Sequence, residues 1–443
     1  MRIQTSIFGG FALAAFAIAA NATSITVNDP GDSGTGVCAT TCTLRDAIAS
    51  AAPNDTIVFA GTLTYPATIT LNGQELLVYK NLTILGPGAG LLAIDGNQQS
   101  RILEIAANAT VSVSGVAMNN GMVAGANGGF STASRAPDGG DAYGGGVLVN
   151  AGSTLQLIAS QLAGNRAVGG LGGVSFQIGS RQGDGGSAHG GAIYSAGTLS
   201  IKDCSVTGNV SSGGASGFAP PDPSILPGNG GSGTGGAIEA TGLTEINNSQ
   251  FSNNSAQGAS GGFSFGLNPG GNGGAALGGT LAFSGFSVLS FVASLGGSVA
   301  PGLYGFGSPN GSSGQAVGAD VYSTATVLSR YVALTSTSGA SACSIATSST
   351  QGANLDADGS CGNFTLHGDA KLQVLTSGGQ TYAFPLWGSP LIDAAADCKD
   401  AFGTTLTADV RGGPRPLDGN ADGIAACDIG AVESDELFAN GFE

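Results

Sequence analysis

The sequence predicts an all-β protein, a right-handed parallel β-helix with Gly-rich lateral loops and a short N-terminal capping helix. Glycine makes up 79 of 443 residues and charged residues only 9%, a composition unlike that of ordinary helical or α/β enzymes. A unit of about 45 residues recurs along the chain. Its short alternating apolar runs indicate strands, and units of this kind bury apolar side chains only against their neighbours, as in a solenoid. Connections between parallel strands are right-handed as a rule.

Residues 1–22 have the features of a Sec-type signal peptide. Arg2 precedes an apolar stretch from Ile7 to Ala20, and small residues follow up to Ala22. Such a stretch is too short to cross a bilayer, which takes about 20 residues. We therefore expect an exported mature chain with no transmembrane segment.

Residues 23–55 are expected to form an N-terminal cap. Within them, Thr43 to Ala49 is the one convincing amphipathic helical stretch of the chain. A helix at the open end of a β-helix covers apolar core and unpaired strand edges, which would otherwise promote aggregation.

Residues 56–340 are assigned to the β-helix itself. Short apolar runs in residues 56–122 have the spacing of successive coil strands. These runs are Ile57–Phe59, Ile69–Leu71, Leu82–Leu85, Ile102–Ile105 and Val111–Val113.

The repeats occupy residues from about 141 to 325, and each copy opens with a glycine. A unit of about 45 residues suits two coils, with residues 169–186, 211–233 and 258–274 as lateral loops. With coils about 4.8 Å apart, a dozen or so coils would make a rod on the order of 60 Å long. The opening glycines are Gly144, Gly190, Gly235, Gly273 and Gly318, which are 46, 45, 38 and 45 residues apart.

This register predicts a structural asparagine ladder from Asn165, Asn209 and Asn254, with Phe291 at that position in the fourth unit. Asn tolerates the left-handed conformation of a sharp corner, and stacked Asn side chains can hydrogen-bond along a column. Cys204 takes a core position in the same register, so we interpret it as a small buried residue rather than a reactive thiol. The apolar column of this register is Leu157, Ile201, Ile246 and Phe283.

The other six cysteines suggest three disulfides in an exported chain. Proximity in the sequence is the basis for each pair. The pairs are Cys38 with Cys42, Cys343 with Cys361, and Cys398 with Cys427.

Several segments carry a family resemblance. Residues 42–48 (Cys-Thr-Leu-Arg-Asp-Ala-Ile) resemble the Cys-Ser-Leu-Arg-Glu-Ala motif near the start of many bacterial secreted β-helix proteins. The Gly-Gly-Ala-Ile repeats resemble those of such proteins and, more loosely, of polymorphic outer-membrane proteins. Residues 341–433 closely resemble the domain called choice-of-anchor Q. The segments that carry this likeness are 352–361, 388–394, 409–416 and 427–433.

The resemblance implies export and frequent pairing with C-terminal sorting signals, and it implies no enzymatic activity. The chain has no Leu-Pro-x-Thr-Gly motif. Residues 434–443 instead resemble short endings of exported proteins from some Gram-negative bacteria. This tail is either a sorting signal or merely a final strand, and we expect a secreted or cell-surface protein of a Gram-negative bacterium.

The charge balance excludes nucleic acid as a partner. Thirteen Lys and Arg against 29 Asp and Glu give a net charge of −16, a field that repels phosphate backbones. An enzyme of this shape would act on polysaccharide in a groove along one sheet. However, glycoside hydrolysis needs two carboxylates at a set separation, and the acids of the repeats share no register column. The bases Arg166, Arg181 and Lys202 are equally isolated.

Two further features favour a structural interpretation. His189 aligns with Tyr143, Thr234 and Asn272, a position that accepts any residue, so we expect it to be solvated. Residues 262–266 (Gly-Phe-Ser-Phe-Gly) satisfy the nucleophile-elbow pattern, but they lie in a Gly-rich loop and not at a strand-to-helix turn.

One segment has the pattern of a calcium loop. Asp418, Asn420 and Asp422 place side-chain oxygens at positions 1, 3 and 5, and glycine follows at position 6. Position 12 is Ile429 where Glu is expected, although Asp428 is adjacent. A structural calcium site and an Asx-rich solvated turn are both open interpretations.

The function that fits these observations is that of a non-catalytic β-helix protein, displayed at or released from a bacterial surface. Its lateral loops would contact a surface, matrix or glycan ligand, although these loops offer no aromatic cluster of the usual carbohydrate-binding kind. A secreted polysaccharide lyase or hydrolase is the alternative, and a purely structural spacer is a third interpretation.

Overall fold

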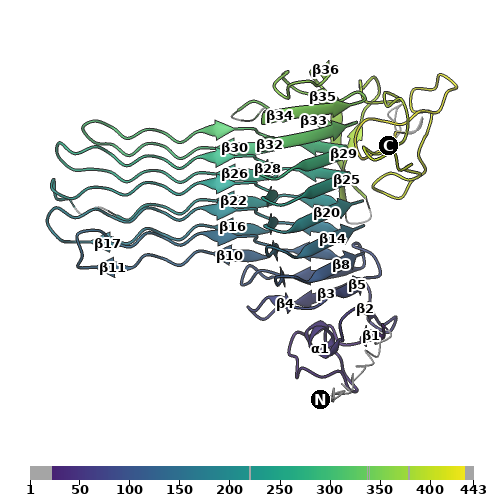
Figure 1. Ribbon diagram of the computed structural model, residues 1–443, viewed down its shortest axis with the longest axis horizontal. Coiled ribbons are helices and arrows are strands. Elements are labelled where there is room, and N and C mark those ends of the chain that lie inside the picture. Colours follow the sequence, from purple (N-terminus) through teal and green to yellow (C-terminus); the bar gives the residue numbers. More distant parts are fainter. Residues whose placement is uncertain (1–21, 219–220, 337, 339, 378–379, 435–443) are drawn as a thin grey trace, which may run out of the picture.

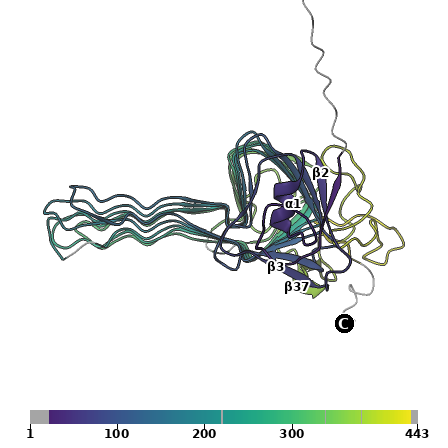
Figure 2. The same cartoon turned by 90° about the horizontal axis from the view of Figure 1, so that it is seen from below.

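The computed structural model describes residues 22–218, 221–336, 338, 340–377 and 380–434. Parallel strands stack into a coiled body, with the helix α1 (Leu44–Ser50) at its N-terminal end and irregular C-terminal segments packed against one side (Figure 1). Long loops leave the opposite side together as a thin projection (Figure 2). We call this projection the fin. It consists of the described residues of 125–141, 169–187, 213–232, 258–275 and 301–315.

Three parallel ladders form the body. The first contains β1 (Ser24–Val27), β2 (Asp55–Phe59), β5 (Leu82–Leu85), β8 (Thr110–Ser114), β14 (Thr154–Ile158), β20 (Thr198–Lys202), β25 (Thr244–Ser252), β29 (Ser287–Leu295), β32 (Val321–Arg330) and β34 (Cys343–Gln351). The second contains β3 (Ala67–Thr70), β6 (Leu92–Asp95), β9 (Ala117–Asn119), β15 (Gln161–Ala163), β21 (Ser205–Thr207), the ends of β25 and β29, β33 (Ala333–Leu334), β35 (Leu355–Asp356) and β36 (Leu366–His367). The third contains β4 (Leu76–Val78), β7 (Leu103–Ile105), β13 (Val147–Val149), β19 (Ile193–Ser195), β24 (Ile238–Ala240), β28 (Leu281–Phe283) and the starts of β32 and β34.

Further ladders form the base and tip of the fin. The outgoing arms begin with β10 (Met122–Ala124), β16 (Arg166–Val168), β22 (Val210–Ser212), β26 (Ser255–Gln257) and β30 (Ser298–Ala300). The returning arms end with β12 (Ala142–Tyr143), β18 (Ala188–His189), β23 (Gly233–Thr234), β27 (Ala276–Leu277) and β31 (Ala316–Val317). At the tip, β11 (Phe130–Ser131) pairs with β17 (Val174–Ser175). The hairpin of β37 (Leu372–Ser377) and β38 (Gln380–Pro385) is antiparallel.

The predicted fold class is confirmed, but each repeat makes one coil and not two. Leu155 of β14 pairs with Val111 on one side and Leu199 on the other, and each partner is one 44-residue coil away. The fin is formed by the segments expected as lateral loops, and the remaining strands of each repeat fill only one coil. The first ladder holds ten strands among the described residues, and β36 adds one further level in the second ladder, so at about 4.8 Å per step the body is about 48 Å long, shorter than the expected length of about 60 Å.

The fourth repeat opens at Gly278 and not at Gly273. Gly278 has a φ of +63°, as do the other opening glycines within a few degrees, and Ile238 pairs with Leu281 just after it. The Gly-Gly-Ala sequence at residues 273–275 in the fin arm accounts for the wrong alignment, because the true opening at 278–280 reads Gly-Gly-Thr. As a result, Leu289 and not Phe283 continues the apolar column beyond Ile246.

Asn165, Asn209 and Asn254 form a fully buried column of hydrogen bonds. The Nδ2 atom of Asn165 donates to Oδ1 of Asn209 at 2.9 Å, and Nδ2 of Asn209 donates to Oδ1 of Asn254 at 3.0 Å. These amides replace apolar side chains at one corner of the core, where every buried polar group needs a partner.

The ladder asparagines were expected to adopt the left-handed conformation at the corner, but the residues before them adopt it instead. The left-handed residues are Gly164, Gly208 and Asn253, each directly before a ladder asparagine. Phe291 does not continue the ladder, because it stacks on Asn248, its register neighbour in β25. Gly297 follows Asn254 in the next coil, since Ser255 pairs with Ser298.

The N-terminal helix closes the body as predicted. Thr43 caps α1, and its side chain and that of Asp46 form a capping box. Leu44, Ala47 and Ile48 face inward and join the apolar core of the first coils. No helix among the described residues is long and apolar enough to cross a bilayer.

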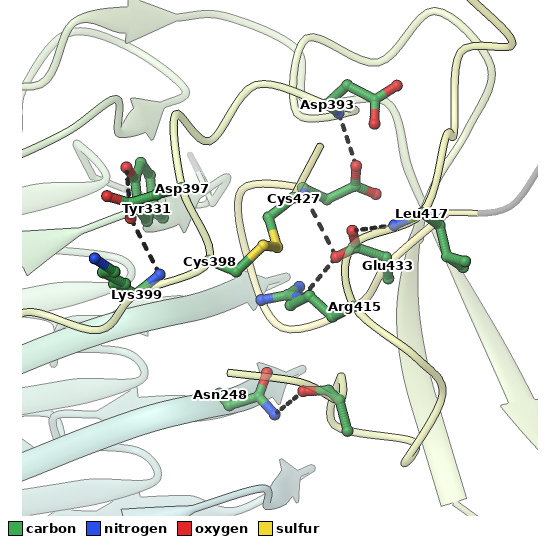
Figure 3. The surroundings of a disulfide bond; sticks show 12 residues. Asn248, Tyr331, Asp393, Asp397, Cys398, Lys399, Arg415, Leu417, Cys427 and Glu433 are labelled. Carbon is green, nitrogen blue, oxygen red and sulfur yellow. Dashed lines mark hydrogen bonds and ion pairs between the residues drawn. A yellow bond between two sulfur atoms is a disulfide. The ribbon is translucent and has the colours of Figure 1, made fainter. Parts of the chain in front are cut away.

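The C-terminal segments pack against the corner formed by Phe291 and Tyr331. The Arg415 guanidinium lies 4.5 Å from the centre of the Phe291 ring, and Arg415 pairs with Glu433 at 2.6 Å with both side chains fully buried. Figure 3 shows this ion pair beside the disulfide of Cys398. A buried ion pair therefore helps to hold the C-terminal segments together.

The structure contains the three expected disulfides, which join Cys38 to Cys42, Cys343 to Cys361 and Cys398 to Cys427. Cys204 is the free cysteine, and it is fully buried. Burial raises the pKa of its thiol to about 12, so it is a poor nucleophile at neutral pH.

Candidate functional site

Side chains capable of recognition gather where the base of the fin meets the third ladder. In each coil that carries a fin loop, a left-handed glycine, such as Gly190 with φ +63°, turns the chain from the fin into this ladder. Tyr143 and His189 stack in the fin-base ladder, and Tyr194 and Glu239 stack in the third ladder. We call these four residues the Tyr–His site.

The four side chains are in contact with one another. The His189 ring stacks on Tyr143 with centres 4.7 Å apart and planes 8° apart, and Tyr194 meets Tyr143 edge-on at 4.8 Å. His189 Nδ1 lies 2.8 Å from a carboxylate oxygen of Glu239. The hydroxyl of Tyr143 donates to Asp141 at 3.3 Å. Three rings and two carboxylates thus share one partly exposed surface.

The carboxylates determine the protonation of the site. Burial alone would lower the pKa of His189, but its hydrogen bond to Glu239 and the charges of Glu239 and Asp141 raise that pKa above its ordinary value. Burial and the same carboxylates raise the pKa of Tyr143. Hence the tyrosine hydroxyl stays a neutral donor at physiological pH.

A hollow of about 180 Å³ lies next to Glu239. Typical small-molecule pockets measure roughly 300–1,000 Å³, so this hollow would hold one small unit of a longer ligand. Its walls provide a carboxylate, hydroxyls and apolar surface. The lining residues are Thr234, Glu239, Leu277, Ala282, Phe283, Ser284, Tyr322 and Thr324.

Arg101 supports the N-terminal end of the Tyr–His site. Its guanidinium donates to the backbone carbonyls of Tyr143 and Gly144, each at 2.9 Å, and it pairs with Glu75 and Glu104. Because its donors are engaged in this way, Arg101 fixes the position of Tyr143 and is not free to bind an acidic ligand.

Chemically, this arrangement suits the recognition of neutral sugars. Ring faces pack against apolar C–H surfaces, while carboxylates and hydroxyls exchange hydrogen bonds with neutral hydroxyl groups. Hydrolysis would require two carboxyl groups on opposite sides of the scissile bond. Here, Glu239 is instead engaged by a histidine.

The expectations for His189 were wrong in two respects. Its side chain is only 20% exposed and pairs with Glu239, so it is not simply solvated. Its column continues with Thr234 and Leu277, and Asn272 is not part of it. Glu239 lies 50 residues after His189, or one coil plus a glycine turn, and that spacing is the signal that sequence reasoning missed.

The fin carries a second group of charges that the sequence analysis treated as isolated. Arg181 stacks on Arg135 in the next coil. Asp184 accepts from both guanidinium groups, at 3.0 Å and 3.1 Å, and Asp138 pairs with Arg135 at 2.8 Å. This network is exposed and alternates in sign, so its contribution to stability is small.

The expectation that the lateral loops lack aromatic clusters was also wrong. Phe130 and Phe176 stack with ring centres 6.2 Å apart, and Phe263 and Phe306 stack at 5.7 Å. These rings lie on successive coils of the fin, which brings residues about 45 positions apart into contact.

The predicted calcium ligands are not all brought together. The oxygens of Asp418 accept from the amides of Asp422 and Gly423, so this segment is an exposed Asx-type turn. Asp428 is fully buried and accepts from Asp393 and Ser434 instead. No group of three or more His, Cys, Asp or Glu suited to a metal occurs within the described part of the chain, and calcium stays a prediction that rests on the loop pattern.

Comparisons with known proteins give only distant structural similarities. No protein-family model matches the chain, and no curated protein matches it. Among solved structures, a pectin methylesterase in complex with a hexasaccharide is similar at a TM-score of 0.31 and 10% identity, over 82% of this chain and 85% of the other. A pectate lyase is similar at 0.30 and 14% identity, over 93% of this chain and 96% of the other.

Proposed function

We propose that the protein is an exported, non-catalytic β-helix protein that binds neutral polysaccharide at the Tyr–His site. The observation that carries this proposal is the contact among Tyr143, His189, Tyr194 and Glu239 beside a solvent-accessible hollow. Such a site combines ring faces with charged hydrogen-bond acceptors, as recognition of sugar rings requires.

The charges favour a neutral glycan over an acidic one. The chain carries a net charge of −16, and Asp141 and Glu239 add negative charge at the site itself. The nearby cation Arg101 already pairs with Glu75 and Glu104. A polyuronate would therefore be repelled at long range, and Arg101, the cation that contacts Tyr143, is already engaged by two carboxylates.

The direct test is affinity electrophoresis of the mature chain in gels that contain neutral glucans, galactans or mannans, with polygalacturonate as the acidic comparison. We expect retardation by a neutral polymer and none by polygalacturonate. Tyr194→Ala and Glu239→Gln should each weaken binding about tenfold, because each removes a ring contact or a charged hydrogen bond worth about 1.4 kcal/mol.

Tyr79→Ala is the matched control, since Tyr79 is an exposed tyrosine on the first coils. It should bind as the parent does. Retardation that is equal in the parent and both site variants would refute the Tyr–His site. No retardation by any neutral polymer would favour the structural spacer.

A second candidate function is polysaccharide cleavage. It is favoured by the position of His189, whose raised pKa arises from Glu239 and Asp141, because a histidine tuned by carboxylates is a common acid–base group. Release of new reducing ends from a bound polymer, abolished by Glu239→Gln and retained in Tyr79→Ala, would establish cleavage. Binding without such release would support the non-catalytic function.

A surface or secreted location is part of the proposal. Residues 1–21 and 435–443, which hold most of the signal peptide and of the tail, lie outside the described residues. Fractionation of native cells with intact-mass analysis would test it. A chain in the medium or on washed cells that lacks residues 1–22 would support export, and an uncleaved chain in the cytoplasm would overturn it.

A further inference from the structure

We propose that the fin carries a second binding site, a cavity that accepts an uncharged acyl chain. The cavity has a volume of about 510 Å³, within the roughly 300–1,000 Å³ of typical ligand pockets. Four phenylalanines from three coils surround it, together with three serines and glycine backbone. The phenylalanines are Phe218, Phe263, Phe265 and Phe306.

The walls of this cavity are held by backbone hydrogen bonds between coils. The amide of Gly261 donates to Leu303 at 2.9 Å, and the amide of Ser264 donates to Phe306 at 2.8 Å. The Phe263 and Phe306 rings stack with planes only 8° apart. A cavity whose walls are already in place requires little ordering when a ligand binds.

The charge pattern indicates an uncharged occupant. Residues 246–319 contain no Asp, Glu, Lys, Arg or His, and no titratable residue lines the cavity. A charged ligand would lose hydration there without finding a partner.

The polar groups of the lining favour hydrocarbon over sugar. Ser216, Ser260 and Ser264 are the polar side chains among the lining residues, whereas a sugar ring presents hydroxyl groups in every direction. The phenylalanine rings expose a large apolar area, and Phe218 alone is 71% exposed. Contiguous apolar surface of this kind commonly marks a binding site, and an acyl chain would cover it.

The test is binding of the uncharged fluorophore N-phenyl-1-naphthylamine to the full mature chain, with displacement by a medium-chain monoacylglycerol. The probe variant is Phe263→Ala with Phe306→Ala. The matched control is Phe130→Ala with Phe176→Ala, which removes a stacked and similarly exposed pair from the same fin but outside the cavity. Unchanged melting temperatures would show that both variants are folded.

We expect saturable binding by the parent and the control, displacement by the monoacylglycerol, and at least tenfold weaker binding by the cavity variant. Equal loss in both variants would mean a general apolar surface and would overturn the proposal. Displacement by a neutral glucan and not by the monoacylglycerol would assign the cavity to sugar. A dimer that dissociates in the cavity variant would make a second copy of the chain the occupant, and that too would overturn it.

Discussion

The body and the fin are built from the same coils but are stabilised in opposite ways. In the body, Leu157, Ile201 and Ile246 stack in one column and exclude water with their side chains. In the fin, the neighbouring chains approach so closely that side chains are excluded instead. A Cβ atom at Gly231 would lie 1.9 Å from the carbonyl oxygen of Gly186.

Hydrogen bonds between glycines link the two arms of each fin loop and also link one loop to the next. The amide of Gly186 donates to Gly170, that of Gly214 to Gly186, and that of Gly231 to Gly214, at 2.8–2.9 Å. Glycines recur at intervals of three in these arms, as at Gly228 and Gly231. Collagen uses the same interval where extended chains pack at an axis that admits only glycine. In the fin, therefore, glycine allows the chains to pack closely and to form hydrogen bonds with one another, and it does not make them flexible.

The largest effect is expected in the body. Ile201→Ala should lower the free energy of unfolding by about 2–5 kcal/mol, because it leaves a cavity in a fully packed column. Ile178→Ala is the matched control at the fin, where Ile178 is 83% exposed, and it should change stability by less than about 0.5 kcal/mol. Urea unfolding would measure both, and similar losses would contradict the distinction between body and fin.

A pH effect should follow from Asp320, a fully buried carboxyl in the body. It accepts from Ser294 at 2.6 Å and from the Ser336 amide at 2.8 Å, yet burial raises its pKa from 3.8 to about 6. The folded state holds this proton more tightly than the unfolded state. Stability from this group is therefore full below about pH 4 and is lost as the pH rises through 6.

Asp320→Asn keeps the shape of the side chain and removes this titration. Relative to the parent, the variant should gain about 3 kcal/mol in free energy of unfolding between pH 4 and pH 7.5, at about 1.4 kcal/mol per unit of pKa. Urea unfolding at the two pH values measures this difference. Parallel pH profiles for the parent and the variant would show that Asp320 does not titrate as described.

A smaller and local effect is expected from Gly231→Ala in the fin. The added methyl group meets backbone that cannot move without breaking the hydrogen bonds between coils, and overpacking of this kind costs about 1–3 kcal/mol. Hydrogen exchange should increase in residues 169–187 and 213–232, while the body stays protected. Gly61→Ala is the control, because nothing lies near the added atom. Unchanged exchange in the fin would refute the role of glycine packing.

The smallest effect concerns calcium in the C-terminal segments. If the Asp418 turn binds the ion, calcium at ten times its Kd should stabilise the parent by about 1.4 kcal/mol. Asp418→Ala with Asp422→Ala should remove the increment. A melting temperature that is the same with calcium and with a chelator would refute the calcium site and would support the interpretation as an Asx-type turn.

The sequence predicted the solenoid because its strands, corner asparagines and capping helix depend on local residue patterns. Coil length was misjudged, since two-coil and one-coil repeats have the same periodicity and only strand pairing distinguishes them. The contact between His189 and Glu239 depends on that coil length and on the left-handed turn at Gly235. The aromatic stacks of the fin were missed for the same reason, because Phe263 and Phe306 meet only when the coils are in register.

Hydrogen exchange of the mature chain, with and without a fragment of the neutral polysaccharide that retards it, tests the central claim most directly. The account predicts protection at residues 141–145, 187–195 and 234–240, which carry the Tyr–His site, and no change at the fin tip. Protection at residues 260–266 and 303–307 alone would contradict it and would move glycan recognition to the fin.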